Sequence, residues 1–141
     1  MKNQTPSILD QIAAPAGSFE WMLTAQEKVI SSGWRWRELT PVFSKLREEV
    51  DELEEAVTHQ TRAEMVEELG DLLWMATILC HYLDITPTEA IHAMEPKLRS
   101  RFGAIEARAQ ASGRTIAEVP VEEQRAWYRD VKASEDKETT E

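Results

Sequence analysis

The chain has 141 residues, of which 42% are hydrophobic and five are tryptophan. This length fits one globular domain, and the aromatic and aliphatic content argues against a disordered chain. The 26 acidic residues outnumber the 16 lysines and arginines, giving a net charge of −10. Duplex nucleic acid is therefore not expected as a partner, because phosphate backbones are bound by basic faces. An anionic small molecule would need a cation between itself and the protein.

The first segment, residues 1–17, contains two prolines and a glycine after position 5 and is predicted to be an N-terminal arm with at most a short helix over 7–14. It has no apolar core of a secretory signal. Ser18 is a preferred N-cap residue, and a helix is predicted over 19–31. A loop rich in tryptophan and arginine follows over 34–37.

Two longer helices are predicted over 40–59 and 63–83, joined by a short connection. Apolar residues recur in both at steps of three and four, which is typical of helices with one apolar face. The first stripe contains Phe43, Leu46, Val50, Leu53 and Val57, and the second contains Val66, Leu69, Leu73, Ala76 and Cys80. The second half of 63–83 is apolar on nearly all sides, which predicts a central position or a subunit interface.

A fourth helix is predicted over 87–111, and Pro96 inside it is expected to kink or split it. A short last helix is predicted over 121–132, and the polar residues 133–141 are predicted to form a disordered tail. The sequence has no alternation typical of strands. The prediction is therefore an all-α, four-helix-bundle-like domain over 18–132.

The location of the protein is predicted from its cysteine and its apolar runs. The single cysteine, Cys80, lies in an apolar run and is expected to be a buried thiol in a reducing compartment, the cytoplasm. The longest apolar run, 72–80, is too short to span a bilayer, so no membrane association is expected.

Acidic residues are concentrated near the connection between the second and third predicted helices. Glu49 and Glu52 are three residues apart, as are Glu68 and Asp71. Residues at this spacing share a helix face, so an antiparallel hairpin would bring the two pairs together. Four converging carboxylates would need a cation or bound protons, and an all-oxygen site favours Mg²⁺ or Mn²⁺ over Zn²⁺.

Two other interpretations of the acidic residues were weighed against a metal site. Runs of glutamate on helices commonly form solvated, salt-bridged faces, as expected for Glu54 and Glu55. A di-iron bundle would need two Glu-x-x-His repeats on separate helices, and the sequence supplies one, Glu89 to His92. We therefore set the di-iron bundle aside, while spacing alone leaves the metal site and the salt-bridged surface open.

Five segments in a fixed order extend the pattern beyond the carboxylates. They are Ser32-Gly33-Trp34-Arg35-Trp36, Glu48-Glu49-Val50-Asp51-Glu52, Glu68-Leu69-Gly70-Asp71, Lys97-Leu98-Arg99-Ser100-Arg101-Phe102, and the closing stretch from Gly113 to Lys132. This set resembles the MazG family of all-α nucleoside triphosphate pyrophosphohydrolases, whose pattern is EExxE followed by ExxD. The similarity covers roughly residues 20–132 and looks closest to the C-terminal, catalytic half of two-domain MazG proteins.

The resemblance implies a role for each acidic residue of the motifs. Glu49, Glu52, Glu68 and Asp71 would bind the metal, and Glu48 would be a neighbouring acid that holds a second ion or orients water. The catalytic set that it implies therefore consists of these five carboxylates.

The resemblance also implies a set of substrate contacts. They are Lys97, Arg101, Lys132, Trp127, Tyr128 and Trp36. Lys97 and Arg101 are four residues apart on one helix face, where a lysine point charge and an arginine fork suit phosphate oxygens. The family's closing helix carries a tryptophan that contacts the base, and that position falls on Tyr128, with Trp127 one residue earlier. Either ring could stack on a base.

The activity implied by the resemblance is Mg²⁺-dependent hydrolysis of (deoxy)nucleoside triphosphates between the α- and β-phosphates, giving the monophosphate and pyrophosphate. Such an enzyme would serve house-cleaning of nucleotide pools, and because the family forms dimers or dimers of dimers, we expect at least a homodimer. Two alternatives stay open. One is an enzyme of the same superfamily specific for dUTP, dCTP, a modified nucleotide or a guanosine alarmone. The other is an acidic helical module that binds a partner protein without catalysis.

Overall fold

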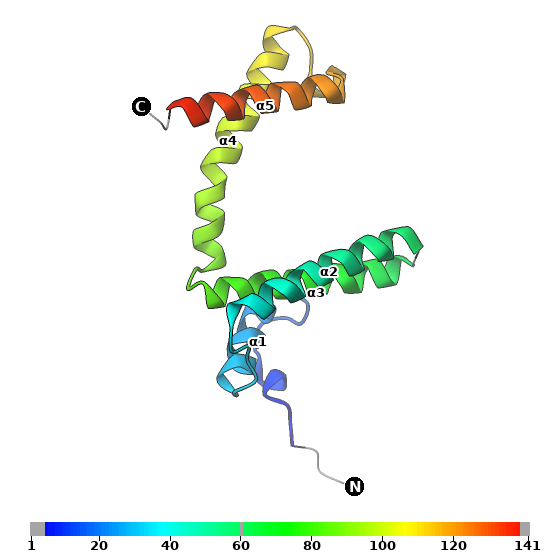
Figure 1. The fold of residues 1–141 in the computed structure, drawn as a ribbon, viewed down its shortest axis with the longest axis vertical. Coiled ribbons are helices and arrows are strands. Elements are labelled where there is room, and N and C mark those ends of the chain that lie inside the picture. Colours follow the sequence, from blue (N-terminus) through cyan, green and yellow to red (C-terminus); the bar gives the residue numbers. More distant parts are fainter. Residues whose placement is uncertain (1–4, 60, 139–141) are drawn as a thin grey trace. The chain divides into compact units, whose positions relative to one another are not determined.

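The computed structural model describes residues 5–59 and 61–138, and every regular element in this part of the chain is helical (Figure 1). The elements in order are η1 (Ile8–Gln11), α1 (Phe19–Ser31), α2 (Leu39–His59), α3 (Arg62–Tyr82), α4 (Pro87–Ala111), η2 (Ile116–Glu118) and α5 (Val121–Glu138), where η marks a 3-10 helix. The predicted all-α class is confirmed. Within the described ranges, no helix is long and apolar enough to cross a membrane. The chain divides into two compact units, Met1–Pro87 and Thr88–Glu141.

An antiparallel hairpin of α2 and α3 dominates the first unit, and the two helices run side by side (Figure 1). The start of α3 is fixed by a capping box at Thr61. The Thr61 hydroxyl accepts a hydrogen bond from the Glu64 backbone N–H at 3.4 Å, and the Glu64 carboxylate accepts one from the Thr61 backbone N–H at 2.7 Å. This exchange satisfies two backbone donors that a helix start otherwise leaves open, and the chain reverses just before it.

The core of the first unit forms where α2, α3 and the 34–37 loop meet. Val42, Met75 and Ile78 are buried there. The side chains packed against them are Trp36, Leu39, Leu46, Trp74, Leu79 and Tyr82. The N-cap of helix α1 is Ser18, as predicted, and its hydroxyl accepts a hydrogen bond from the Trp21 backbone N–H at 3.1 Å.

Much of the predicted apolar stripe lies outside this core. The side chains concerned, each between 37% and 65% exposed, are Phe43, Val50 and Val57 on α2 and Val66, Leu69 and Leu73 on α3. We call these six residues the exposed hairpin stripe. Cys80, expected to be buried, is only partly buried. The helical periodicity was therefore predicted correctly, but the sequence did not show which apolar positions the chain buries within itself.

The second unit contains α4, η2 and α5. Helix α4 continues without a break through Pro96, so the expected split is absent. Proline removes one backbone donor, and the turns on either side keep their helical form. Helix α5 continues to Glu138, six residues past the predicted end at 132, so the tail predicted to be disordered is helical over 133–138. An ion pair from Arg101 Nε to Glu135 Oε2, at 2.8 Å, anchors this extension on α4. Residues 139–141 lie outside the described ranges.

Candidate metal centre and adjoining pocket

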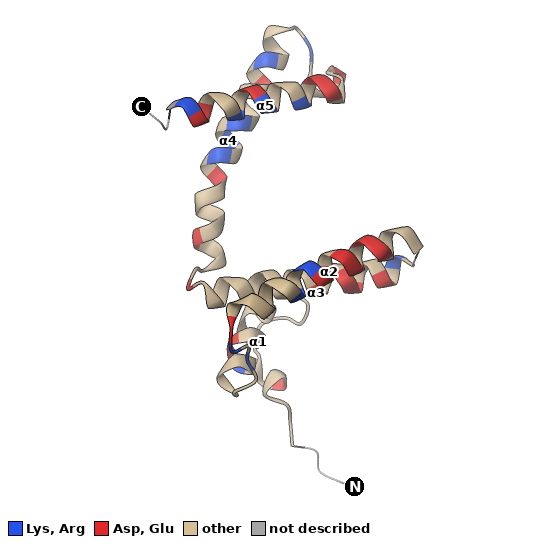
Figure 2. Ribbon diagram, viewed as in Figure 1, with Lys and Arg blue, Asp and Glu red and all other residues tan. Residues whose placement is uncertain are grey.

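Three of the predicted metal ligands come together on the hairpin. Glu49 on α2 and Glu68 and Asp71 on α3 each offer one carboxylate oxygen, and these atoms lie within 4.8 Å of one another. Figure 2 shows acidic residues gathered along both hairpin helices. The arrangement follows from the sequence, because the three-residue spacing puts Glu68 and Asp71 on one face of α3 and the short connection turns α2 back onto that face.

Glu49 is the buried member of this cluster, with 4% of its surface exposed. Its Oε1 atom lies 2.8 Å from Lys45 Nζ, and the same ammonium lies 3.1 Å from Glu48 Oε2. Hydrogen bonds to Glu49 and Glu48 raise the pKa of Lys45 well above its usual value, so this lysine is a fixed positive charge. The Oε2 atom of Glu49 is enclosed and has no hydrogen-bond partner in the described part of the chain.

The fourth predicted ligand, Glu52, lies beside the cluster and is not one of the three that converge. It is partly buried, one helical turn beyond Glu49. Desolvation raises the pKa of Glu52, the positive charge of Lys45 opposes this shift, and the neighbouring Glu49 carboxylate adds to it. Glu52 therefore shares the electrostatic environment of the cluster.

The residues present fit a hard divalent cation. A buried carboxylate oxygen without a donor is rare in native proteins, and such a group indicates an ion or a water. The converging atoms are all carboxylate oxygens. Mg²⁺ and Mn²⁺ prefer an all-oxygen set of ligands of this kind, whereas Zn²⁺ does not require one. Glu49, Glu68 and Asp71 could hold the ion, and Glu52 lies one helical turn beyond Glu49 on α2.

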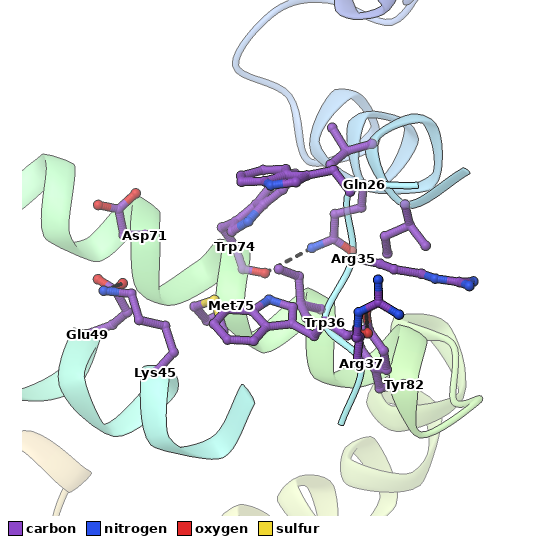
Figure 3. Close-up of a pocket in the computed structure, with 14 residues that line it drawn as sticks. Gln26, Arg35, Trp36, Arg37, Lys45, Glu49, Asp71, Trp74, Met75 and Tyr82 are labelled. Atoms are coloured by element: carbon purple, nitrogen blue, oxygen red, sulfur yellow. Dashed lines mark hydrogen bonds and ion pairs between the residues drawn. The ribbon is translucent and has the colours of Figure 1, made fainter. Parts of the chain in front are cut away.

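A pocket of about 580 Å³ adjoins the cluster, and Glu49 and Asp71 are part of its wall. In Figure 3 these two acids lie at one end of the pocket, and Gln26 lies at the other. The tryptophans at 36 and 74 lie between the two ends. Most of the remaining wall is aliphatic or aromatic and comes from α1 and α3. The pocket thus combines a cation-binding end with an apolar end that Arg35 and Arg37 flank (Figure 3). This combination suits a ligand with an anionic part and a flat, uncharged part.

Hydrogen bonds fix the apolar end of the pocket. The Tyr82 hydroxyl donates to the Trp36 backbone carbonyl at 2.8 Å, which ties the loop to α3. The Gln26 amide nitrogen donates to the Trp74 carbonyl at 2.9 Å and to the Thr77 hydroxyl. Trp34 lines the same pocket but is 78% exposed, so its ring is available to a ligand.

Several pocket residues were not predicted from the sequence. They are Gln26, Arg35, Arg37, Lys45, Trp74 and Tyr82. Lys45 could have been found, because it lies four residues before Glu49 on the same helix and therefore shares its face. The others come from separate elements, and nothing in their spacing indicates a common site. Trp36 was predicted and does line the pocket.

The remaining predicted substrate contacts belong to the second unit. Lys97 on α4 and Lys132 on α5 are exposed. The Arg101 guanidinium donates to the Tyr128 hydroxyl at 3.1 Å and lies 5.7 Å from the centre of that ring. Hydrogen bonds to Glu135 and Tyr128 raise the pKa of Arg101 above its usual value. Trp127 lies under the guanidinium of another arginine, Arg114. Arg101 and Tyr128 therefore form one cluster.

Comparison with known proteins gives a consistent result. Residues 38–103 match the family model of the MazG nucleotide pyrophosphohydrolase domain. The nucleoside triphosphate pyrophosphohydrolase/pyrophosphatase MazG of Thermotoga maritima is 29% identical over 111 residues, which are 79% of this chain and 42% of that protein. A nucleoside triphosphate pyrophosphohydrolase of Escherichia coli K12 is 29% identical over 133 residues, which are 92% of this chain and 50% of that protein. The chain spans about half the length of the curated relatives it matches.

Proposed function

We propose that this chain, which carries a MazG-family domain over residues 38–103, hydrolyses nucleoside triphosphates between the α- and β-phosphates. The products would be the monophosphate and pyrophosphate, and the role would be house-cleaning of nucleotide pools. The observation that carries the proposal is the enclosed, unpartnered Glu49 Oε2 beside Glu68 and Asp71. These carboxylates line or adjoin a pocket whose other end is largely aromatic and is flanked by Arg35 and Arg37 (Figure 3).

The carboxylates are proposed to hold Mg²⁺, with Mn²⁺ as a possible substitute. The ligands would be Glu49, Glu52, Glu68 and Asp71. A bound divalent ion neutralises phosphate charge and lowers the pKa of coordinated water. Glu48 would accept a hydrogen bond from the attacking water. No covalent nucleophile is required, since catalysis of phosphoryl transfer is mostly positioning and charge stabilisation.

Basic and aromatic residues are proposed to position the rest of the substrate. Lys97, Arg101 and Lys132 would contact the phosphates, as the family resemblance implies. For the base, the pocket favours Trp36, because that residue lines the same cavity as the acids. Trp127 and Tyr128 remain the candidates that the resemblance supplies.

A second copy of the chain is proposed to cover the exposed hairpin stripe. Apolar side chains in consecutive helical turns, 37% to 65% exposed, mark an association surface more often than a solvated one. Light scattering should give a mass of at least two chains. Val57→Lys, which puts a charge into the stripe away from the acids, should shift the mass toward one chain. A single-chain mass for the unaltered protein would contradict the dimer.

The activity is tested by pyrophosphate release from a panel of nucleotides. The panel contains the canonical ribo- and deoxyribonucleoside triphosphates, an oxidised nucleotide and a guanosine alarmone, each with and without Mg²⁺. Asp71→Asn should abolish release, because the variant keeps the size of the side chain and removes its charge. Glu55→Gln is the matched control on the exposed side of α2 and should leave release unchanged. Absence of release from every nucleotide would favour a partner-binding module, and release from one nucleotide alone would identify a specific enzyme.

A further inference from the structure

Gln26 is a buried amide at the end of the pocket opposite the acids. It is 4% exposed. Both hydrogens of its Nε2 atom have acceptors, the Trp74 carbonyl at 2.9 Å and the Thr77 hydroxyl. The Thr77 hydroxyl in turn donates to the backbone carbonyls of the preceding turn, at 2.9 Å for Trp74 and 3.2 Å for Leu73. It therefore has only a lone pair to offer Gln26.

This network decides which way the amide faces. A side-chain amide can usually be turned over without changing its shape. Here the turned amide would put an oxygen against the Trp74 carbonyl, which can only accept, so the orientation with nitrogen toward α3 is the stable one. The Oε1 atom is consequently the free end, and it has no donor in the described part of the chain.

The free oxygen is reached from the pocket. Glu49 Oε2 is the one enclosed, unpartnered side-chain polar atom among the described residues. Gln26 Oε1 also has no hydrogen-bond partner among the described residues, but it is not enclosed as Glu49 Oε2 is. Gln26 is part of the pocket wall. A buried carbonyl oxygen without a donor favours a ligand that supplies an N–H or O–H group. It repels phosphate oxygens, which the proposed cation held by the acids would attract to the other end.

We propose that Gln26 Oε1 accepts a hydrogen bond from an N–H group on the edge of a nucleobase, an inference that rests on the proposed function. Each canonical base has such a group: the amino groups of adenine and cytosine, the ring and amino N–H groups of guanine, and the ring N–H of uracil and thymine. A single acceptor therefore admits all of them and selects against bases without a donor. The structure assigns Gln26 to the base end of the pocket as a residue that determines specificity.

The test uses two nucleotides whose bases have no N–H group, the triphosphates of purine riboside and of pyrimidin-2-one riboside. The value of kcat/KM for each is compared with that for the canonical purine and pyrimidine triphosphates, using the full chain with Mg²⁺. The unaltered protein should prefer the canonical base by roughly tenfold, the size expected for one neutral hydrogen bond to a buried acceptor. Gln26→Met, which has a similar length and no acceptor, should bring this ratio close to one.

Thr77→Val is the matched control for the packing around the amide. It removes one acceptor from Gln26 Nε2 but leaves the Trp74 carbonyl, so the Gln26 amide keeps its orientation. The ratio of kcat/KM between canonical and donor-free bases should therefore stay the same. Circular dichroism establishes whether each variant is folded. If Gln26→Met does not fold, calorimetric binding of the α,β-methylene analogues of the same nucleotides to the unaltered protein decides between the outcomes.

Equal kcat/KM values or affinities for canonical and donor-free bases would overturn the inference, as would an unchanged ratio in a folded Gln26→Met. Discrimination between ribose and deoxyribose without discrimination between bases would also overturn it, because the donor would then be a sugar hydroxyl. Failure of the proposed function looks different. In that case the unaltered protein would release no pyrophosphate from any nucleotide, while calorimetry would still report whether the bases are distinguished.

Discussion

The ion pair between Lys45 and the buried Glu49 allows a direct test of the cation site without any nucleotide. Lys45→Met removes the ammonium that lies 2.8 Å from Glu49 Oε1 and keeps most of the aliphatic stem. The Glu49 side chain is only 6% exposed, whereas the Lys45 side chain is 33% exposed. The substitution therefore leaves a nearly buried carboxylate without the ion-pair partner that it has in the described part of the chain.

The expected loss lies between two known limits. Breaking a fully buried pair costs about 3–5 kcal/mol, and breaking an exposed pair costs about 0–1 kcal/mol. Because one partner is buried and the other is a third exposed, we expect Lys45→Met to lower the free energy of unfolding by about 2 kcal/mol in metal-free buffer. Mg²⁺ should recover most of this loss, since binding to the folded state alone contributes about 2.7 kcal/mol at a hundred times Kd.

Urea unfolding followed by tryptophan fluorescence measures this effect in the right part of the molecule. Four of the five tryptophans lie in the unit Met1–Pro87, which contains the cluster. Arg47→Met is the matched control, because it removes a positive charge from an exposed position on the same helix. The reasoning is refuted if Lys45→Met loses no more stability than Arg47→Met. It is also refuted if Mg²⁺ stabilises both variants and the unaltered protein by the same amount.

Three further predictions concern the caps, the hairpin surface and the second unit. Hydrogen bonds from the backbone and hydroxyl of Thr61 hold the pKa of Glu64 below its ordinary value of 4.5, so their stabilisation is present above that value and is lost as the pH falls through the lowered pKa. Glu64→Gln should therefore lower the urea midpoint near neutral pH and reduce the dependence of that midpoint on pH as the pH falls below the ordinary glutamate pKa; an unchanged dependence would contradict this cause. Gly70 lies inside α3, and a Cβ added there would meet no atom of another part of the chain within 4 Å. Gly70→Ala should therefore stabilise the chain by about 0.5–1 kcal/mol in urea unfolding. A loss of stability would show that another helix or a second copy approaches this position. Lys97→Ala should raise KM for the nucleotide several-fold with an unchanged circular dichroism spectrum. Arg99→Ala, at an exposed position two residues farther along α4 and on another face of the helix, should not; equal effects would remove the specific role of Lys97.

The features that the sequence predicted well are local in the chain. The N-cap at Ser18 and the acid pairs on the hairpin follow from spacings of three or four residues and from one short connection. The physical rule in each case concerns neighbouring turns of a helix. Lys45 could have been predicted for the same reason, because it lies one helical turn before Glu49.

The features that the sequence did not predict depend on contacts between distant residues. The sequence predicted an apolar stripe on α2, yet its members Val50 and Val57 are exposed while Val42 and Ala56 are buried. Periodicity shows that a helix has an apolar face, but it does not show whether that face is covered by the same chain. The end of α5 was misjudged for a similar reason, because Glu135 is held by Arg101, 34 residues earlier.

The order of side chains along α3 links the proposed metal end to the proposed base end. Asp71, Trp74, Met75 and Ile78 follow one another at steps of three, one and three residues along the wall of a single pocket. Thr77, whose hydroxyl accepts a hydrogen bond from Gln26, lies six residues after Asp71, and at a rise of about 1.5 Å per residue this places it about 9 Å farther along the helix axis. A base held at Gln26 and a phosphate held through the proposed cation at Asp71 therefore need a spacer between them, which a ribose provides in a nucleotide. A free base or a free phosphate could occupy one end but could not bridge the two, so we expect both ends to contribute to the affinity only when the ligand is an intact nucleotide.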